Sequence, residues 1–142
     1  MEKRLEDFVR ISRFAGGRVD YTQGGGGNTS VKFNGGLMAI KASGYRLSDI
    51  TEDDGYVLVD YNEVRKFYRQ ADPIRGRELE GEIVKGAIRQ REGMKALRPS
   101  VEVGFHALLS DFVIHIHSVY AAIVVCNRDG ERQMEELLKG KD

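Results

Sequence analysis

The sequence predicts a single α/β domain. The chain has 142 residues, enough for one hydrophobic core but too few for two, so residues 1–142 are treated as one unit. Short runs rich in β-branched residues predict strands, and two runs with apolar residues at helical spacing predict helices. Glycine clusters and charged stretches separate these runs and mark the connections.

The first helix is predicted for residues 2–15. Its apolar residues recur at the three, four and seven spacing of an amphipathic helix: Leu5, Phe8, Val9, Ile11 and Ala15. Two glycines follow, as is common at the C-terminal end of a helix. Nothing in this segment predicts chemistry, so we expect it to pack against the rest of the domain.

Three strands and a charged connection are predicted next. Residues 30–33 and 37–41 read as a β-hairpin around Asn34-Gly35-Gly36, and residues 56–60 read as a further strand. Residues 62–98 carry many charges and few apolar side chains. We therefore expect a peripheral connection there, with one surface helix over residues 76–91.

The apolar run from Phe112 to Val125 begins with a predicted buried strand that contains His115 and His117. Alternate strand residues share a face, so the two imidazoles should project side by side. Two adjacent imidazoles are suited to zinc, although two hydrogen-bonded histidines with no metal are the plainer alternative. A short helix after Ser118 and a charged helix over residues 131–139 complete the chain.

Four successive glycines, from Gly24 to Gly27, precede Asn28, Thr29 and Ser30. Glycine lets a backbone approach a ligand and lets N–H groups converge on an anion, so this segment predicts a cradle for a phosphate or polyol. A flexible turn before a strand is the alternative. The run lacks the Lys-Ser/Thr ending of a Walker loop, and the following strand does not fit a Rossmann fingerprint.

Two further segments carry candidate site residues. The turn Ala42-Ser43-Gly44 either completes the anion site or is an ordinary turn. A helix is expected near Ser100 because it follows a proline, and Ser100 and Glu102 then serve either as helix caps or as site residues. A carboxylate beside a metal-bound substrate can act as a general acid or base. His106, four residues after Glu102 on the same helical face, is either a further metal ligand or, as we expect, a histidine that packs within the helix.

Charge and cysteine content narrow the class of protein. The 22 basic and 22 acidic residues are interleaved, which argues against a nucleic-acid partner, and no apolar run approaches the length of a membrane span. Cys126 is the single cysteine, so no intramolecular disulfide can form, and we expect a reducing, cytoplasmic location. Its apolar neighbours predict that Cys126 is buried.

The order of these motifs resembles the class II aldolase/adducin family. The resemblance is closest to the aldolase domain of rhamnulose-phosphate aldolase/alcohol dehydrogenase proteins, and it runs from about Leu5 to Cys126. It rests on four segments in sequence order: Gly26-Gly27-Asn28-Thr29-Ser30, Ala42-Ser43-Gly44, Pro99-Ser100-Val101-Glu102 with His106 four residues later, and Val113-Ile114-His115-Ile116-His117.

This resemblance implies a three-layer α/β/α fold around a mostly antiparallel sheet. It implies reversible, zinc-dependent aldol cleavage of a sugar phosphate through an enediolate. Glu102 would be the catalytic acid/base, and His115 and His117 would be zinc ligands. The substrate phosphate would be held by Gly27, Asn28, Thr29, Ser43, Gly44 and Ser100. Val101 departs from the family, which often has a second serine there.

Length is the second departure from the family. Its members carry a third histidine ligand and several closing strands beyond the His-X-His segment, whereas no histidine follows His117 here. We therefore expect a domain shortened at its C-terminus that lacks the last strands and forms a homo-oligomer, a tetramer by resemblance. The alternatives are a non-catalytic adducin-like or regulatory binding module, or one fragment of a split aldolase.

Overall fold

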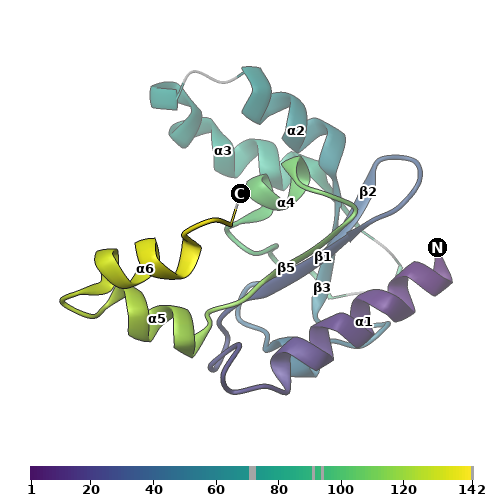
Figure 1. Ribbon diagram of the computed structural model, residues 1–142. Helices are drawn as coiled ribbons and strands as arrows, with labels where there is room; N and C mark the ends of the chain where they lie inside the picture. The colour runs from purple at the N-terminus through teal and green to yellow at the C-terminus, as the bar shows by residue number, and fades with distance from the viewer. Residues whose placement is uncertain (71–72, 91, 94, 142) are drawn as a thin grey trace.

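A computed structural model describes residues 1–70, 73–90, 92–93 and 95–141, with the backbone alone at residues 73–78. Its centre is a five-stranded antiparallel sheet with the strand order β4-β3-β2-β1-β5 (Figure 1). Helices cover both faces of this sheet, so the predicted α/β class, with three layers and an antiparallel centre, is confirmed.

The elements have the following bounds. The strands are β1 Asn28–Lys32, β2 Leu37–Lys41, β3 Tyr56–Asp60, β4 Ile88–Arg89 and β5 Phe112–His115. The helices are α1 Glu2–Gly16, α2 Tyr61–Gln70, α3 Pro73–Ala87, α4 Val103–Leu108, α5 Val119–Val125 and α6 Gly130–Leu138, with a 3-10 turn, η1, at Leu47–Asp49.

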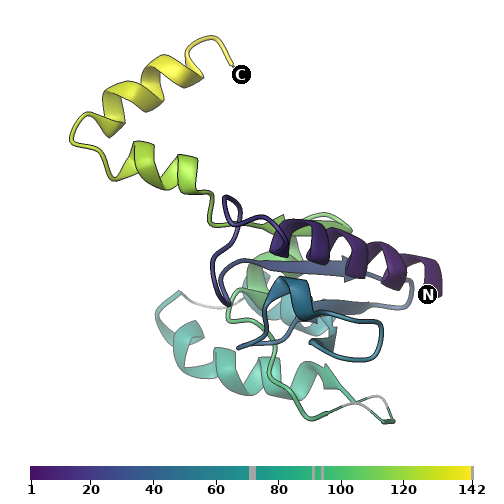
Figure 2. The same cartoon turned by 90° about the horizontal axis from the view of Figure 1, so that it is seen from below.

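Helix α1 covers one face of the sheet, as its apolar spacing predicts (Figure 2). Phe8 is fully buried there, and its ring meets Tyr56 edge-on with the centroids 5.7 Å apart. The predicted hairpin also forms, with Gly35 and Gly36 at φ +88° and +89° in its turn. These positive φ angles suit glycine because it has no Cβ.

Helices α2, α3 and α4 cover the opposite face. The helix predicted over residues 76–91 corresponds to α3, but the prediction that residues 62–98 are a peripheral connection is wrong for the residues described in that range. Helix α2 begins directly after β3 and buries Val64, and β4 pairs with β3 through Val59 and Ile88. A few apolar residues are enough to pack these helices on the sheet, because one apolar side chain per helix turn can face it.

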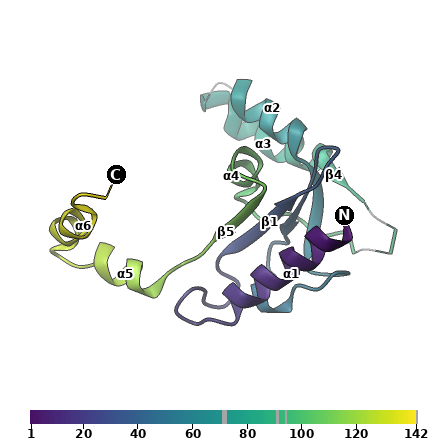
Figure 3. The same cartoon turned by 45° about the vertical axis from the view of Figure 1, so that its right-hand side comes forward.

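The C-terminal end of the described chain is exposed. The predicted strand forms as β5, but its predicted burial is wrong: within the described sheet β5 is an edge strand paired with β1, and Ile114 on it is 48% exposed. Cys126 is also exposed, contrary to prediction. Both follow from the position of α5 and α6, which extend away from the sheet (Figure 3). Among the described residues, no helix is long and apolar enough to cross a membrane.

Candidate active site

Three segments far apart in sequence meet beside the N-terminal end of β1. The glycine loop leads into Asn28, the turn Ala42-Ser43-Gly44 follows β2, and residues 98–102 precede α4. The last two segments are joined by backbone hydrogen bonds, from Ser43 N to Arg98 O at 2.8 Å and from Ser100 N to Lys41 O at 3.0 Å. The sheet adds the histidine segment, because Asn28 and His115 are partners across β1 and β5.

A hydrogen-bonded cluster forms at this meeting point. Asn28 Nδ2 donates to the Glu102 carboxylate and lies 3.2 Å from Ser100 Oγ. Ser100 Oγ in turn lies 3.3 Å from Glu102 Oε2, and His115 Nδ1 lies 3.0 Å from Glu102 Oε1. Glu102 is therefore held by an amide, a hydroxyl and an imidazole, and the fold joins four residues that sequence reasoning selected separately.

The cluster contains one unmatched polar atom. Asn28 is 2% exposed, and its Oδ1 is buried with no hydrogen-bond partner among the residues that the structure describes. The opposite amide orientation would turn this oxygen toward the Glu102 carboxylate, where two acceptors would repel each other. A buried acceptor without a donor costs free energy, so Asn28 Oδ1 is suited to accept a hydrogen bond from a bound molecule.

His115 and His117 lie together at the open side of the cluster. Their ring centroids are 4.9 Å apart, although His117 lies just beyond the end of β5. His115 faces Glu102 through Nδ1, which leaves its Nε2 free for another contact. Gly26 packs against the second imidazole so closely that a Cβ there would lie 2.9 Å from His117 Nδ1. A side chain at this position would therefore displace the His117 ring from where it lies.

This donor set fits a divalent metal in part. Two imidazoles at this spacing match the nitrogen ligands that zinc prefers, and Glu102 supplies a neighbouring carboxylate. Among the described residues, however, no three His, Cys, Asp or Glu side chains form a group that could hold a metal ion. Catalytic zinc typically has three protein ligands, and His115 and His117 would supply two of them.

His106 is a packing residue, as expected. It is 1% exposed, and its Nδ1 lies 2.7 Å from Ser30 Oγ. Burial lowers the pKa of His106 to about 4, against an opposing effect of the nearby Glu102 charge. The imidazole therefore stays neutral near pH 7 and is held within the core.

The remaining predicted residues differ in their placement. Gly27 has φ +71°, and a Cβ there would lie 2.7 Å from His115 O, so the loop and the histidine strand are in close contact. Ser43 and Gly44 are exposed beside the cluster. The Thr29 side chain is not brought to the cluster, because it faces α1 and bonds Ser12 Oγ at 2.6 Å. Adjacent strand residues point to opposite faces, and Asn28 takes the site side.

The capping interpretation of the segment before α4 is not supported. The helix begins at Val103, and Ser100 bonds the cluster instead of a helix N–H. Glu102 occupies the N-cap position, but its side chain makes no cap hydrogen bond. Both side chains are therefore directed to the site.

Sequence reasoning missed Lys41. Its side chain is buried, and Nζ donates to the backbone oxygens of Tyr45 at 2.7 Å, Gly25 at 3.2 Å and Ala42 at 3.4 Å. Burial lowers the pKa of this ammonium, partly offset by Glu102. Lys41 therefore fastens the glycine loop to the turn after β2. A lysine at the end of an apolar strand is the only sequence signal, and it does not reveal the Gly25 contact.

The chain matches the model of a known protein family. The family model described as "Class II Aldolase and Adducin N-terminal domain" matches residues 6–139. No curated protein shows significant sequence similarity to the chain.

Two of the solved structures that match share the fold. An N-terminal class II aldolase domain of a conserved protein from Thermoplasma acidophilum is 24% identical over 94% of this chain, with a TM-score of 0.76. An L-fuculose 1-phosphate aldolase is also 24% identical, over 89% of this chain, with a TM-score of 0.58. The present chain spans 64% and 49% of those two chains, respectively.

Proposed function

This chain belongs to the class II aldolase and adducin family, and we propose that it carries the site of a metal-dependent aldolase that cleaves a sugar phosphate reversibly. The observation that carries the proposal is the contact of Glu102 with both Asn28 and His115. A carboxylate beside a pair of imidazoles combines a proton carrier with nitrogen ligands. Packing of the hydrophobic core does not require these polar groups to meet at an exposed edge of the sheet.

In this proposal Glu102 moves the proton at the carbon next to the substrate carbonyl. The Asn28 amide and the Ser100 hydroxyl orient its carboxylate, and partial exposure, 29% for Glu102, leaves it accessible to a substrate. His115 and His117 hold a divalent metal, zinc in the first instance. When bound, such a metal polarises the carbonyl oxygen as a Lewis acid.

The phosphate is assigned to the surface formed by the glycine loop and the neighbouring turn. Gly27 and Asn28 end the loop, and Ser43 and Gly44 lie beside Ser100 through the backbone bonds of residues 41–43 to residues 98–100. Backbone N–H groups and small hydroxyls suit a phosphate. Lys41 supports this assignment because it ties the two segments together. Thr29 contributes only its backbone.

A retro-aldol assay tests the proposal. A panel of ketose 1-phosphates is incubated with the zinc-loaded chain, and release of dihydroxyacetone phosphate is followed with a coupled dehydrogenase. We expect turnover that falls at least about 100-fold in Glu102→Gln, in the range for loss of a general acid or base. Glu131→Gln, on α6 and outside the cluster, is the matched control and should keep full activity. No release at any zinc concentration would refute the aldolase assignment.

A binding module without turnover is the second candidate. It is favoured by the finding that the described residues include no group of three potential metal ligands. Calorimetry with the same ketose 1-phosphates separates the two functions. Binding that weakens in Asn28→Ala, without product release at any metal concentration, would support the module, whereas product release would exclude it.

We also propose that the chain self-associates. The support is a set of apolar side chains exposed on β5 and α5, comprising Phe112, Ile114, Val119, Tyr120, Ile123 and Val125. Exposed apolar area of this kind commonly marks an interface. Sedimentation equilibrium should show an oligomer that dissociates in Ile123→Glu, and a wild-type monomer at all concentrations would refute the proposal.

A further inference from the structure

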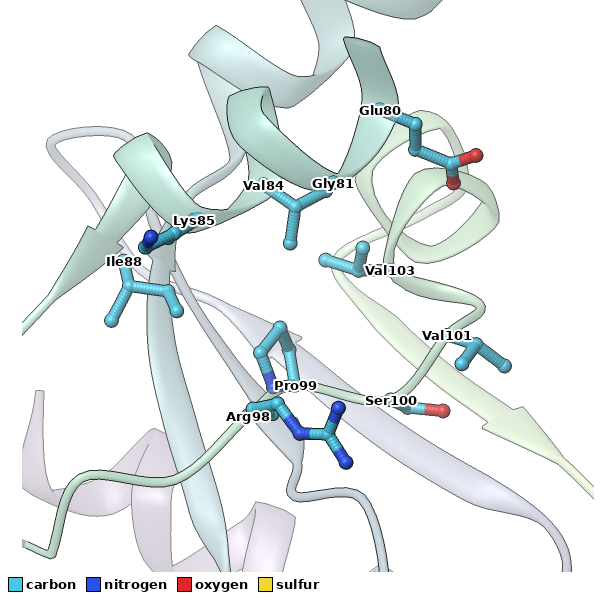
Figure 4. A pocket seen from close by; sticks show the side chains of 10 residues that line it. All are labelled: Glu80, Gly81, Val84, Lys85, Ile88, Arg98, Pro99, Ser100, Val101 and Val103. Carbon is cyan, nitrogen blue, oxygen red and sulfur yellow. The ribbon is translucent and has the colours of Figure 1, made fainter. Parts of the chain in front are cut away.

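A cavity of about 620 Å³ lies between α3 and residues 98–103, next to the candidate active site (Figure 4). Val84 and Val103 lie side by side along its upper side in the view, and Pro99 closes its lower side. Ser100 is its one residue from the Glu102 cluster, and the Ser100 hydroxyl is already engaged there. The cavity is therefore a neighbour of the cluster, and its volume is adequate for a small organic molecule.

The side of α3 that faces this cavity contains a glycine in the helix interior. Gly81 lies three and four residues before Val84 and Lys85, which places all three on one helix face. Glycine within a helix is unfavourable relative to alanine, so a packing reason is expected. No such reason exists among the described residues, because a Cβ on Gly81 would meet no atom within 4 Å. Gly81 therefore contributes no side chain to the cavity lining.

The charged groups around the cavity favour an anion. Arg98 and Lys85 line it, and neither makes an ion pair with any residue that the structure describes. Glu80 is the one acidic residue in the lining, and it accepts a hydrogen bond from the Tyr68 hydroxyl. Two unpaired cations therefore border walls made of valine and proline.

We infer that this cavity is a second ligand site, which binds a small organic anion with an apolar body. The apolar part lies against Val84, Ile88 and Pro99, and the anionic group pairs with Arg98, assisted by Lys85. The site goes beyond the proposed aldolase function and does not depend on it, because none of these side chains belongs to the Asn28–Glu102–His115 cluster.

The test uses 1-naphthalenesulfonate as the probe and methyl resonances as the readout. The probe is titrated into the full chain, and the methyl groups of Val84 and Val103 are followed by NMR. We expect saturable shifts of these resonances and binding at least tenfold weaker in Arg98→Gln. Neutral 1-naphthalenemethanol should also bind at least tenfold more weakly. Arg132→Gln, which removes an exposed arginine on α6, is the control and should leave binding unchanged.

A variant that fills the cavity gives a second test. Gly81→Phe should abolish the shifts and keep the fold, because its Cβ enters open space, and circular dichroism and the unfolding midpoint check this. Shifts that persist in folded Gly81→Phe, or that appear only at Ile123 on α5, would overturn the inference. Binding that is lost in Asn28→Ala but kept in Arg98→Gln would overturn it too, because the probe would then occupy the cluster already described.

Discussion

Helix α1 carries a charge on nearly half of its residues yet buries Leu5, Phe8, Ser12 and Ala15, whereas helix α5 is apolar throughout and buries no residue. The difference lies in their partners. Helix α1 packs on the sheet and on η1, while α5 contacts mainly α6 and extends from the domain (Figure 3). Burial is therefore decided by the available neighbour, and apolar composition alone does not predict it.

The strongest test of this contrast is a pair of truncations. Phe8→Ala should lower the free energy of unfolding by about 3–5 kcal/mol, because it leaves a cavity beneath α1 beside Tyr56. Ile123→Ala, at a side chain 60% exposed on α5, should change the free energy of unfolding of the dissociated monomer by no more than about 0.5 kcal/mol, measured at a protein concentration too low for self-association. Urea denaturation measures both values. Equal losses would show that α5 is covered in solution.

The second prediction concerns how acid affects the stability of the buried core around His106. The pKa of His106 is about 4 in the folded chain and near 6.5 when unperturbed, so the unfolded chain binds more protons between these values. The contribution of the neutral His106 to the free energy of unfolding is therefore complete above pH 6.5 and is lost as the pH falls toward 4. A shift of this size corresponds to roughly 3 kcal/mol. His106→Asn removes the titrating group, and its amide can still hydrogen-bond to Ser30. The decrease in the free energy of unfolding from pH 7 to pH 4.5, measured by urea denaturation, should therefore be smaller in this variant. An identical loss in both proteins would contradict this cause.

A substitution at the exposed site residue His117 should change metal binding and leave the stability of the fold unchanged. His117→Ala should raise the dissociation constant for zinc at least about 100-fold. Removing a residue that only hydrogen-bonds to a metal ligand already weakens metal binding about 10–100-fold, and loss of a ligand should weaken it at least as much. The unfolding midpoint should stay unchanged, since His117 is exposed. Competition with a chromophoric chelator measures the affinity, and His106→Asn is the control. Unchanged zinc affinity in His117→Ala would remove this residue from the metal site.

The smallest effect is expected on α6. Arg132 and Glu136 form an ion pair at 3.0 Å with both side chains more than 60% exposed. Glu136→Gln should lower stability by no more than about 0.5 kcal/mol, because solvent screens such pairs. Thermal unfolding at low and high salt checks this. A larger loss would indicate that α6 is packed against another surface.

Local patterns predicted much of the fold. The spacing of Leu5 and Phe8 identified α1, and Asn34-Gly35-Gly36 identified the hairpin turn. Local patterns failed where a long-range contact decides the outcome. Residues 62–70 form a sheet-covering helix because β3 ends directly before it, and β5 is partly exposed because it is the edge strand of the described sheet and α1 covers it only in part.

The candidate site divides in the same way. The sequence alone determined which residue types were present and that His115 and His117 share a side, because strand periodicity is a property of adjacent residues. Only the tertiary structure decided that Asn28 meets Glu102, 74 residues away, that Thr29 turns to α1, and that Lys41 reaches Gly25. Such contacts depend on strand order and register, which are set by packing across the whole domain and have no local signature in the chain.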